Sequence, residues 1–304
     1  MTAATGYAHR AYAESLSEFG SPQLLPRCEG WILARSIPGT PYRDAMGCYP
    51  LFACCDWSQL PHDIESLDEN LVSLILVTDP FGDYSEETLR HTFKDLVRPF
   101  KEHFIVDLTA NPEGFVHAHH RRNARKTLET ISVETCSVAD SIDEWISLYA
   151  NLAVRHDIRG IARFSDSSFA LQAKVPGAVM LRATHEGRTL GMTWWFVSEG
   201  VGYYHLGAYS DAGYKLCASF GLFSRAIELF RADGLRWLDL GAGAGLANDP
   251  QDGLTRFKRG WSTGTRTAYL CGHILDHSRY SELVEAKGVA PTDYFPAYRK
   301  GEFG

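Results

Sequence analysis

Hydrophobic and polar positions in the second half of the chain follow two clear periods. Apolar residues alternate or run together over 178–184, 189–197 and 201–209, and short turns containing glycine separate these segments. Both features are typical of neighbouring strands joined by hairpins. Over 215–232 the apolar residues instead recur every three or four positions, which predicts a long helix. A short apolar run over 235–240 predicts the next strand.

The residues on either side of this region predict further elements. A basic segment over 115–129 is expected to form a helix, followed by a strand over 131–135 and helices over 141–156 and 167–174. A last strand is expected over 267–274. The second half therefore reads as helix, strand, two helices, three strands, helix and strand, with one later strand.

The first half of the chain alternates in a similar way. Strands are predicted over 30–34, 49–55, 72–77 and 103–108, with a helix over 85–98 before the last of them. This order suggests a second, degenerate copy of the later half, although no sequence repeat accompanies it. The aromatic and charged tail at the end of the chain is expected to pack back onto the body.

Composition and charge exclude several classes of protein. The chain has 304 residues and a formal net charge of −7, so any contact with nucleic acid needs a local basic patch. No run of 18 apolar residues predicts a membrane span, and a soluble cytoplasmic protein is the simplest expectation. Seven cysteines occur without a CxxC pattern, so we expect reduced thiols and no metal site.

A glycine-rich segment follows the strand predicted over 235–240. Asp239 is followed by glycines at 241, 243 and 245, which alone is compatible with binding of a nucleotide or S-adenosylmethionine. A methyltransferase, however, needs a helix directly after such a loop and then a second strand with an acidic end. Pro250 breaks such a helix, and no strand of that kind follows.

Four motifs in order resemble the FemAB-like and BioF2-like acyltransferases of the GNAT superfamily. They are the basic helix HHRRNARK at 119–126, the strand YYHLGAY at 203–209, the strand end LDLGAG at 238–243 and the turn GLTRFK at 253–258. Each motif is common by itself, whereas four in the family's order are more specific. The resemblance covers residues 115–280, and the first 110 residues match with little specificity.

The resemblance implies an α+β (mixed α/β) protein with the GNAT fold, built from two GNAT-like halves in tandem. The expected division is an N-terminal GNAT-like half at 1–112 and an acyltransferase core at 113–280, followed by the packed tail at 281–304. The family's reaction passes an acyl group from a thioester or an aminoacyl ester to an amine. Such a reaction depends on positioning and on stabilising an oxyanion.

The donor is left open by the segment between the central strand and the long helix. GNAT enzymes that use acetyl-CoA carry a glycine- and arginine-containing signature there, whereas residues 210–216 contain one glycine and no arginine. Fem-type enzymes also lack that signature. The co-substrate is therefore expected to be acyl-CoA or aminoacyl-tRNA, without a metal.

Five residues are candidates for the chemistry. The resemblance places Lys258 at the donor carbonyl, where its charge stabilises an oxyanion. Tyr203, His205 and Tyr209 are predicted to share one face of their strand and to move protons. Asp239 is either a base or an orienting acceptor. The alternative for Lys258 is a solvated side chain. For the three residues of the strand it is aromatic packing in a half-buried sheet, and for Asp239 it is a residue that forms a turn.

Seven residues are candidates for binding the donor. The basic helix predicted over 115–129 carries two cationic stripes. Both suit a phosphate-bearing ligand, whether coenzyme A, a sugar nucleotide or a tRNA acceptor end. For the basic residues the alternative is a helix surface that is merely solvated. For Phe257 the alternative is packing under the glycine-rich loop. The candidates are Arg121, Arg122, Arg125, Lys126, Phe257, Gly241 and Gly243.

The sequence thus predicts an N-acyltransferase. It is expected to move an acyl or aminoacyl group from acyl-CoA or aminoacyl-tRNA to an amine of a small metabolite, sugar or peptide precursor. Two alternatives stay open: an S-adenosylmethionine-dependent methyltransferase and a non-catalytic GNAT-fold binding protein. The sequence does not indicate the acceptor's identity or the oligomeric state.

Overall fold

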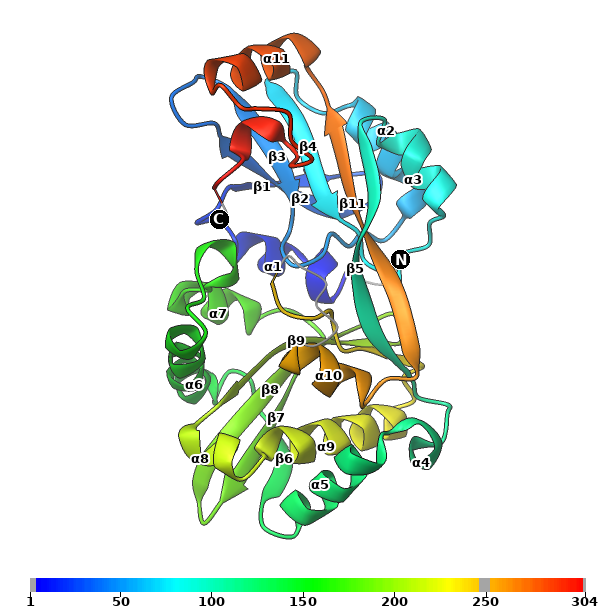
Figure 1. Ribbon diagram of the computed structural model, residues 1–304, viewed down its shortest axis with the longest axis vertical. Helices are drawn as coiled ribbons and strands as arrows, with labels where there is room; N and C mark the ends of the chain where they lie inside the picture. Colours follow the sequence, from blue (N-terminus) through cyan, green and yellow to red (C-terminus); the bar gives the residue numbers. More distant parts are fainter. Residues whose placement is uncertain (1–3, 246–251, 303–304) are drawn as a thin grey trace. The chain divides into compact units, whose positions relative to one another are not determined.

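The computed structural model describes residues 4–245 and 252–302, and it confirms the mixed α/β class. The chain forms two compact units (Figure 1). Unit 1 consists of Met1–Phe100, Gly160–Ala162 and Ala268–Gly304, and unit 2 consists of Lys101–Arg159 and Arg163–Thr267. Two long strands, β5 (Leu96–Asp107) and β11 (Gly264–Ile274), each have residues in both units. The interpretation as two GNAT-like halves stays a prediction.

Unit 1 contains strands in the order β1-β2-β3-β4-β11. β3 and β4 are parallel, and the other pairs are antiparallel. The strands other than β11 are β1 (Ser21–Leu25), β2 (Gly30–Ser36), β3 (Arg43–Gly47) and β4 (Leu71–Val77). The helices are η1 (Gly6–Ala8), α1 (Arg10–Glu14), η2 (Trp57–Gln59), α2 (Leu60–Glu65), α3 (Glu86–Thr92), η3 (Gly160–Ala162), α11 (His277–Ala286) and η4 (Ala297–Arg299).

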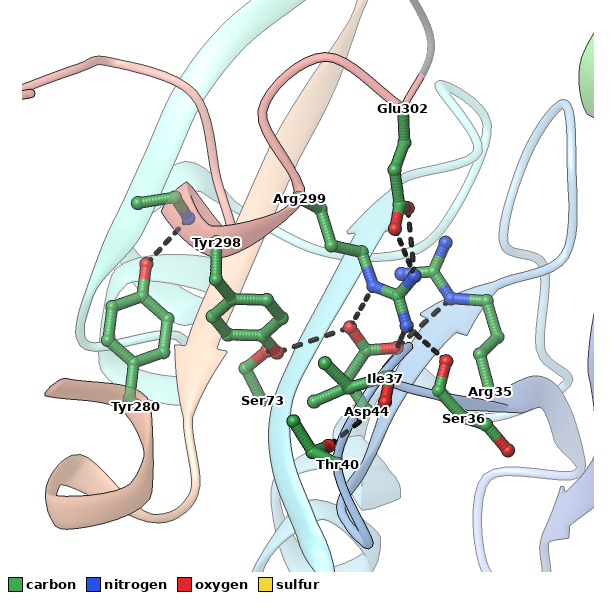
Figure 2. Close-up of polar contacts among 11 residues, drawn as sticks. Arg35, Ser36, Ile37, Thr40, Asp44, Ser73, Tyr280, Tyr298, Arg299 and Glu302 are labelled. Carbon is green, nitrogen blue, oxygen red and sulfur yellow. Dashed lines mark hydrogen bonds and ion pairs between the residues drawn. The ribbon is translucent and has the colours of Figure 1, made fainter. Parts of the chain in front are cut away.

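The C-terminal segment is fixed to unit 1 by buried polar contacts. The Tyr298 hydroxyl contacts the Ser73 hydroxyl at 2.7 Å and donates to the carboxylate of Asp44 at 3.2 Å. The neighbouring Arg299 also donates to Asp44 (Figure 2). Asp44 is fully buried, so its charge requires these donors.

Unit 2 contains strands in the order β5-β10-β9-β8-β7-β6. β9 and β10 are parallel, and the other pairs are antiparallel. The strands other than β5 are β6 (Ser132–Cys136), β7 (Ala178–His185), β8 (Arg188–Ser198), β9 (Val201–Tyr209) and β10 (Trp237–Asp239). The helices are α4 (Pro112–Phe115), α5 (Ala118–Leu128), α6 (Ile142–Arg155), α7 (Asp166–Gln172), α8 (Asp211–Lys215), α9 (Ala218–Ala232) and α10 (Gly253–Arg259).

Helices cover both faces of the strands in unit 2. Helices α5 and α9 lie on one face and α6 and α7 on the other (Figure 1). Alternation along β8 supplies both layers: Trp195 packs against Phe223 and Phe230 of α9, and its neighbour Trp194 packs against Trp145 of α6. Two adjacent buried tryptophans thus fix the sheet between its two helical layers.

Three predictions of local structure are wrong. Residues 49–55 form no strand but only an isolated bridge at Phe52, since Pro50 has no N–H for a ladder. The helix predicted over 85–98 ends at Thr92, because Phe93 has extended backbone and β5 begins at Leu96. The helix predicted over 215–232 is interrupted at Cys217, whose φ of 56° ends α8 before α9 begins.

The sequence patterns also missed elements. β1, β3 and α11 were not predicted, although all three lie in unit 1. β1 contains a proline as its second residue, and β3 is a short segment with charged residues at its start. Neither has the alternation that identified the strands of unit 2.

Candidate active site

The parallel strands β9 and β10 pair over only three residues. Trp237, Leu238 and Asp239 lie opposite Val201, Gly202 and Tyr203. β9 continues to Tyr209, whereas the chain after β10 stays with β5: Leu240 N donates to Phe104 O at 2.8 Å. The two strands therefore separate after Tyr203 and Asp239. The separation leaves the edge of β9 without a strand partner from β10 over 204–209, within the part of the chain that the structure describes.

Lys258 of α10 lies at this separation. Its side chain is buried, and Nζ donates to the Ala242 carbonyl at 2.6 Å. The ammonium also lies 5.5 Å from the centre of the Tyr204 ring on β9. Burial lowers the pKa of Lys258 to about 8, and the nearby carboxylates of Asp239 and Asp252 only partly oppose this effect. The lysine thus combines a fixed position with a pKa close to neutrality.

The glycines between β10 and α10 allow this close packing. Gly241 has a φ of +73°, and a Cβ there would lie 3.1 Å from Lys258 Nζ. At Gly243 a Cβ would lie 2.1 Å from the Thr255 hydroxyl of α10. A side chain at 243 is therefore excluded by α10 itself. The turn is glycine-rich because backbone and helix touch there, and this reason requires no nucleotide.

The beginning of α10 is fixed by its N-cap. The Asp252 carboxylate accepts a hydrogen bond from Thr255 N at 2.8 Å. Hydrogen bonds from this turn lower the pKa of Asp252. The helix that presents Lys258 therefore begins at a defined residue.

A buried carboxylate–imidazole pair lies at the end of β10. Asp239 accepts from Gly241 N at 2.7 Å and contacts His103 Nδ1 of β5 at 2.9 and 3.0 Å. Both side chains are buried. His103 is not among the site residues predicted from the sequence, where its only signal is a titratable side chain at the start of an apolar strand. The pair places a second titratable group where β9 and β10 separate.

The predicted common face of Tyr203, His205 and Tyr209 is wrong. Trp195 lies opposite Tyr204 and Trp194 opposite Leu206, so His205 is the extra residue of a bulge. Beyond the bulge the alternation is inverted, and Tyr209 packs with Tyr204 in the α9 layer. Tyr203 and His205 both adjoin Phe196 on the opposite face.

His205 and the two α9-facing tyrosines differ in their surroundings. The His205 ring contacts Phe164, Trp194 and Phe196, and its Nε2 lies 3.1 Å from Gln172 Oε1. Burial lowers the pKa of His205 to about 3, so the ring is neutral at physiological pH. Burial raises the pKa of Tyr204 and of Tyr209. Both phenols therefore stay protonated near neutral pH.

The four donor-binding residues predicted on α5 fall into two groups. Arg121 donates to Glu113 O at 2.8 Å and to Val116 O, and with Arg125 it lines a pocket of about 440 Å³. Arg122 and Lys126 are exposed on α5 outside this pocket. The two predicted cationic stripes therefore differ in their surroundings, and the stripe of Arg121 and Arg125 borders this pocket.

Phe257 packs within an aromatic cluster rather than in the open. It contacts Phe220, Phe223 and Trp261. The buried His120 of α5 completes the cluster, and its Nε2 lies 3.0 Å from the Phe257 carbonyl. This contact ties the basic helix to the residue directly before Lys258.

Over residues 4–245 and 252–302, no group of three or more histidine, cysteine, aspartate or glutamate side chains is arranged to hold a metal ion. None of the helices in these same ranges has the length and apolar character needed to cross a membrane.

Comparisons with known proteins agree with this geometry. Residues 116–259 match the family model described as an acetyltransferase (GNAT) domain. No curated protein matches the sequence significantly. Solved structures show the same fold at 15% identity. FemX has a TM-score of 0.66, with 90% of this chain and 93% of FemX covered.

Two further structures extend the likeness. The C-terminal domain (DUF2156) of a putative lysylphosphatidylglycerol synthetase from Agrobacterium fabrum has a TM-score of 0.63, with 93% of this chain and 92% of that chain covered. The structure named L-PGS from Bacillus licheniformis has a TM-score of 0.60, with 93% and 98% covered. The protein is therefore an acyltransferase whose residues 116–259 match the GNAT domain model and whose fold is similar to that of FemX.

Proposed function

We propose that the protein is an N-acyltransferase that moves an acyl or aminoacyl group to an amine of a small metabolite, sugar or peptide precursor. The observation that carries the proposal is the buried Lys258 at the separation of β9 and β10. A GNAT core presents its donor carbonyl at such a separation, where strand backbone is open. The lysine adds a fixed positive charge beside that backbone.

Lys258 stabilises the oxyanion that forms when the amine attacks the donor carbonyl. Below its pKa of about 8 the side chain carries a charge and three N–H donors, of which the Ala242 carbonyl accepts one. A buried ammonium acts more strongly on a developing negative charge than a solvated one, because little water screens it. The burial that lowers its pKa thus also strengthens its effect.

The His103–Asp239 pair accepts the proton that the attacking amine loses. A carboxylate bonded to Nδ1 holds the imidazole in the tautomer with a proton on that nitrogen, so Nε2 is left as a base. Asp239 also stabilises the imidazolium once it forms. In this assignment Asp239 is the predicted orienting acceptor, and His103 joins it as the base.

We propose different roles for the residues of β9. Tyr204 and Tyr209 keep their protons, and Tyr204 borders Lys258 and interacts with Tyr209, so either hydroxyl is suited to protonate a leaving thiolate or alkoxide. Tyr203 lies beside Asp239 at the last pair of the parallel ladder. We assign His205 a packing role, because its neutral ring is enclosed by aromatic side chains.

The donor is an acyl-CoA or an aminoacyl-tRNA, and Arg121 and Arg125 are proposed to contact its phosphates. Both donors carry phosphate, so the pocket on α5 suits either one. The name of the lysylphosphatidylglycerol synthetases indicates addition of a lysyl group, which favours including an aminoacyl donor in the tests. We place the reaction in the cytoplasm, where both donors occur.

A ligand-shift and transfer experiment tests this function. Acetyl-CoA, longer acyl-CoA thioesters, lysyl-tRNA and S-adenosylmethionine are compared for their effect on thermal unfolding, and the donor that stabilises is then used with a panel of amines. One of the first three is expected to stabilise and to support transfer. Stabilisation by S-adenosylmethionine alone, or by none of them, contradicts the proposal.

Two matched variants test the role of the lysine. Lys258→Met keeps the side-chain length without the charge, and Lys174→Met makes the same change at an exposed position of unit 2. Loss of one oxyanion donor costs on the order of 100-fold or more in kcat. We expect this loss only in Lys258→Met. A folded Lys258→Met protein with full turnover removes the assigned role.

A further inference from the structure

Unit 1 contains a polar cavity of about 480 Å³, separate from the residues assigned to acyl transfer. Residues 17–21, strands β2 and β3 and the C-terminal segment contribute its lining. Arg35, Arg43 and Arg299 supply the positive charges of that lining. We propose that this cavity binds the phosphate group of a ligand, through Arg35 and Arg43.

The wall of the cavity is built on Asp44. This carboxylate is fully buried and accepts from Arg35 Nε at 3.1 Å, from both Nε and Nη2 of Arg299 and from the Tyr298 hydroxyl (Figure 2). Removing a carboxylate from water is costly unless several donors surround it. The arrangement therefore fixes two guanidinium groups at the cavity.

Arg299 has no donor left for a ligand. A guanidinium has five N–H donors, and Arg299 makes five contacts. Its Nη1 donates to both oxygens of Glu302 at 2.8 Å, and its Nη2 donates to the Ser36 carbonyl at 2.9 Å, in addition to the two bonds with Asp44. The charge of Arg299 is thus committed to the carboxylates of Asp44 and Glu302.

Arg35 and Arg43 retain unused donors. Arg35 uses only Nε within the described part of the chain, and its terminal nitrogens keep some accessible surface although the side chain is largely buried. Arg43 makes one long contact, to the Ala34 carbonyl at 3.5 Å, and no ion pair with any described residue. The open hydrogen-bonding capacity of the two arginines therefore consists of donors with positive charge.

This capacity favours a phosphate over a zwitterionic ligand such as an amino acid. Guanidinium forks match the oxygens of phosphate two at a time. An amino acid also needs an anionic partner for its ammonium group. Glu302 is already bound to Arg299, and Glu18 is an exposed carboxylate with contacts of its own.

Close packing fixes the direction of the Arg35 side chain. Gly20 lies against the start of that side chain: a Cβ at this position would lie 2.9 Å from Arg35 Cγ and 3.1 Å from the Ala34 carbonyl oxygen. Glycine at position 20 thus permits the stem of Arg35 to pass. A positioned guanidinium loses less entropy on binding than a mobile one.

Calorimetric titration of the full chain tests the proposal. Inorganic phosphate and glycerol 3-phosphate represent a soluble ligand, and flotation with phosphatidylcholine vesicles, with or without phosphatidylglycerol, represents a lipid headgroup. Binding of either kind supports the proposal when it depends on Arg43, and the arm that binds identifies the source. Absence of Arg43-dependent binding in both arms overturns it.

Three variants make the dependence specific. Arg43→Gln is expected to weaken binding by about tenfold or more, the effect of losing one charge-assisted contact. Arg27→Gln, an exposed arginine of unit 1 outside the cavity, is expected to bind as the unmodified chain does. Glu18→Gln is expected to bind phosphate more tightly, because a like charge is removed. An equal effect of Arg27→Gln and Arg43→Gln, or weaker binding by Glu18→Gln, contradicts the site.

These results are independent of the proposed acyl transfer. Arg43→Gln changes unit 1 and leaves Lys258 and the His103–Asp239 pair of unit 2 intact. Thermal unfolding of each variant shows whether the fold is retained. Transfer by the unmodified chain without Arg43-dependent phosphate binding therefore overturns the phosphate site alone, whereas Arg43-dependent phosphate binding without transfer overturns the proposed acyl transfer alone.

Discussion

At the scale of single residues, burial decides the chemistry of Lys258. Its ammonium lies away from water, and the pKa falls from 10.5 to about 8 despite two nearby carboxylates. The charge that the proposed mechanism needs is therefore present at neutral pH and lost in mildly alkaline solution. A pH titration can separate this residue from all exposed lysines.

The first prediction concerns the pH profile of transfer. kcat/KM is expected to fall as the pH rises through about 8, because deprotonated Lys258 no longer stabilises an oxyanion. Lys258→Arg keeps its charge at every accessible pH, so its activity, where measurable, is expected to lack that fall. An identical alkaline limb in both proteins assigns the limb to another group.

The same pKa shift predicts a change in stability. The folded-state pKa of Lys258 is lowered, so between about pH 8 and 10.5 the unfolded chain binds more protons than the folded chain. This contribution therefore makes the free energy of unfolding rise with pH in that window. Denaturant titrations are expected to show a smaller rise for Lys258→Met than for Lys174→Met, and equal slopes contradict the shift.

A third prediction concerns Gly241. Gly241 has a positive φ, and a Cβ added there would lie 3.1 Å from Lys258 Nζ, so Gly241→Ala strains the backbone and displaces the ammonium. We expect a loss of about 1–2 kcal/mol in stability together with reduced kcat. Gly253→Ala is the control, since a Cβ there meets no atom within 4 Å. Equal effects of the two substitutions are incompatible with this explanation.

At the scale of elements, α10 is a short helix whose position depends on its first residue. Asp252 caps it through Thr255 N, and Lys258 lies in its last turn. Because the helix is short, a small change at its beginning alters the position of the lysine. We therefore expect the cap to affect catalysis without contacting the substrate.

The fourth prediction follows from this cap. Asp252→Ala is expected to lower stability by about 1 kcal/mol and to reduce kcat through the displaced lysine. Asp252→Asn keeps an oxygen acceptor and is expected to retain most of both properties. Kinetic and denaturant measurements on the pair check this, and a kcat equally low in Asp252→Asn assigns the effect to the lost charge instead.

The helices and strands of unit 2 show which features of local structure the sequence predicts and which it does not. The boundaries predicted for β9 are those observed, because alternation and a glycine turn coincide there. The bulge at His205 left no mark in the apolar pattern, so Tyr209 was placed on the wrong face. The interruption at Cys217 was missed because apolar periodicity continues across it. Apolar periodicity indicates which residues are buried. It does not reveal one extra residue in a bulge or one residue with left-handed backbone.

The candidate site was predictable only in part. Lys258, Asp239 and the glycine turn lie within one short segment, so a motif was able to identify them together. His103 lies on β5, which pairs with β10 from a distant part of the sequence. Nothing local to His103 indicates its carboxylate partner. Pairs formed across a sheet become visible only once the strand order is known.

At the scale of the whole molecule, each unit has its own buried polar centre. Unit 2 encloses Lys258 and the His103–Asp239 pair, whereas unit 1 encloses Asp44 between Arg35 and Arg299. The second centre connects the C-terminal segment to β2 and β3. We therefore expect the stability of unit 1 to depend on residues close to the end of the chain.

The fifth prediction tests this dependence. Asp44→Asn removes the buried carboxylate that two guanidinium groups share, and it is expected to destabilise unit 1 by about 3 kcal/mol or more. Hydrogen exchange is expected to accelerate in β2, β3 and β4 and to change little in β7, β8 and β9. Uniform acceleration across both units shows instead that they unfold together.

The most direct measurement for the central claim is a crystal structure with a non-reactive analogue of the donor that stabilises the protein. The account predicts that the analogue's carbonyl oxygen lies about 3 Å from Lys258 Nζ, between the separated ends of β9 and β10. A carbonyl bound elsewhere, with the ammonium still directed only at Ala242, contradicts the account.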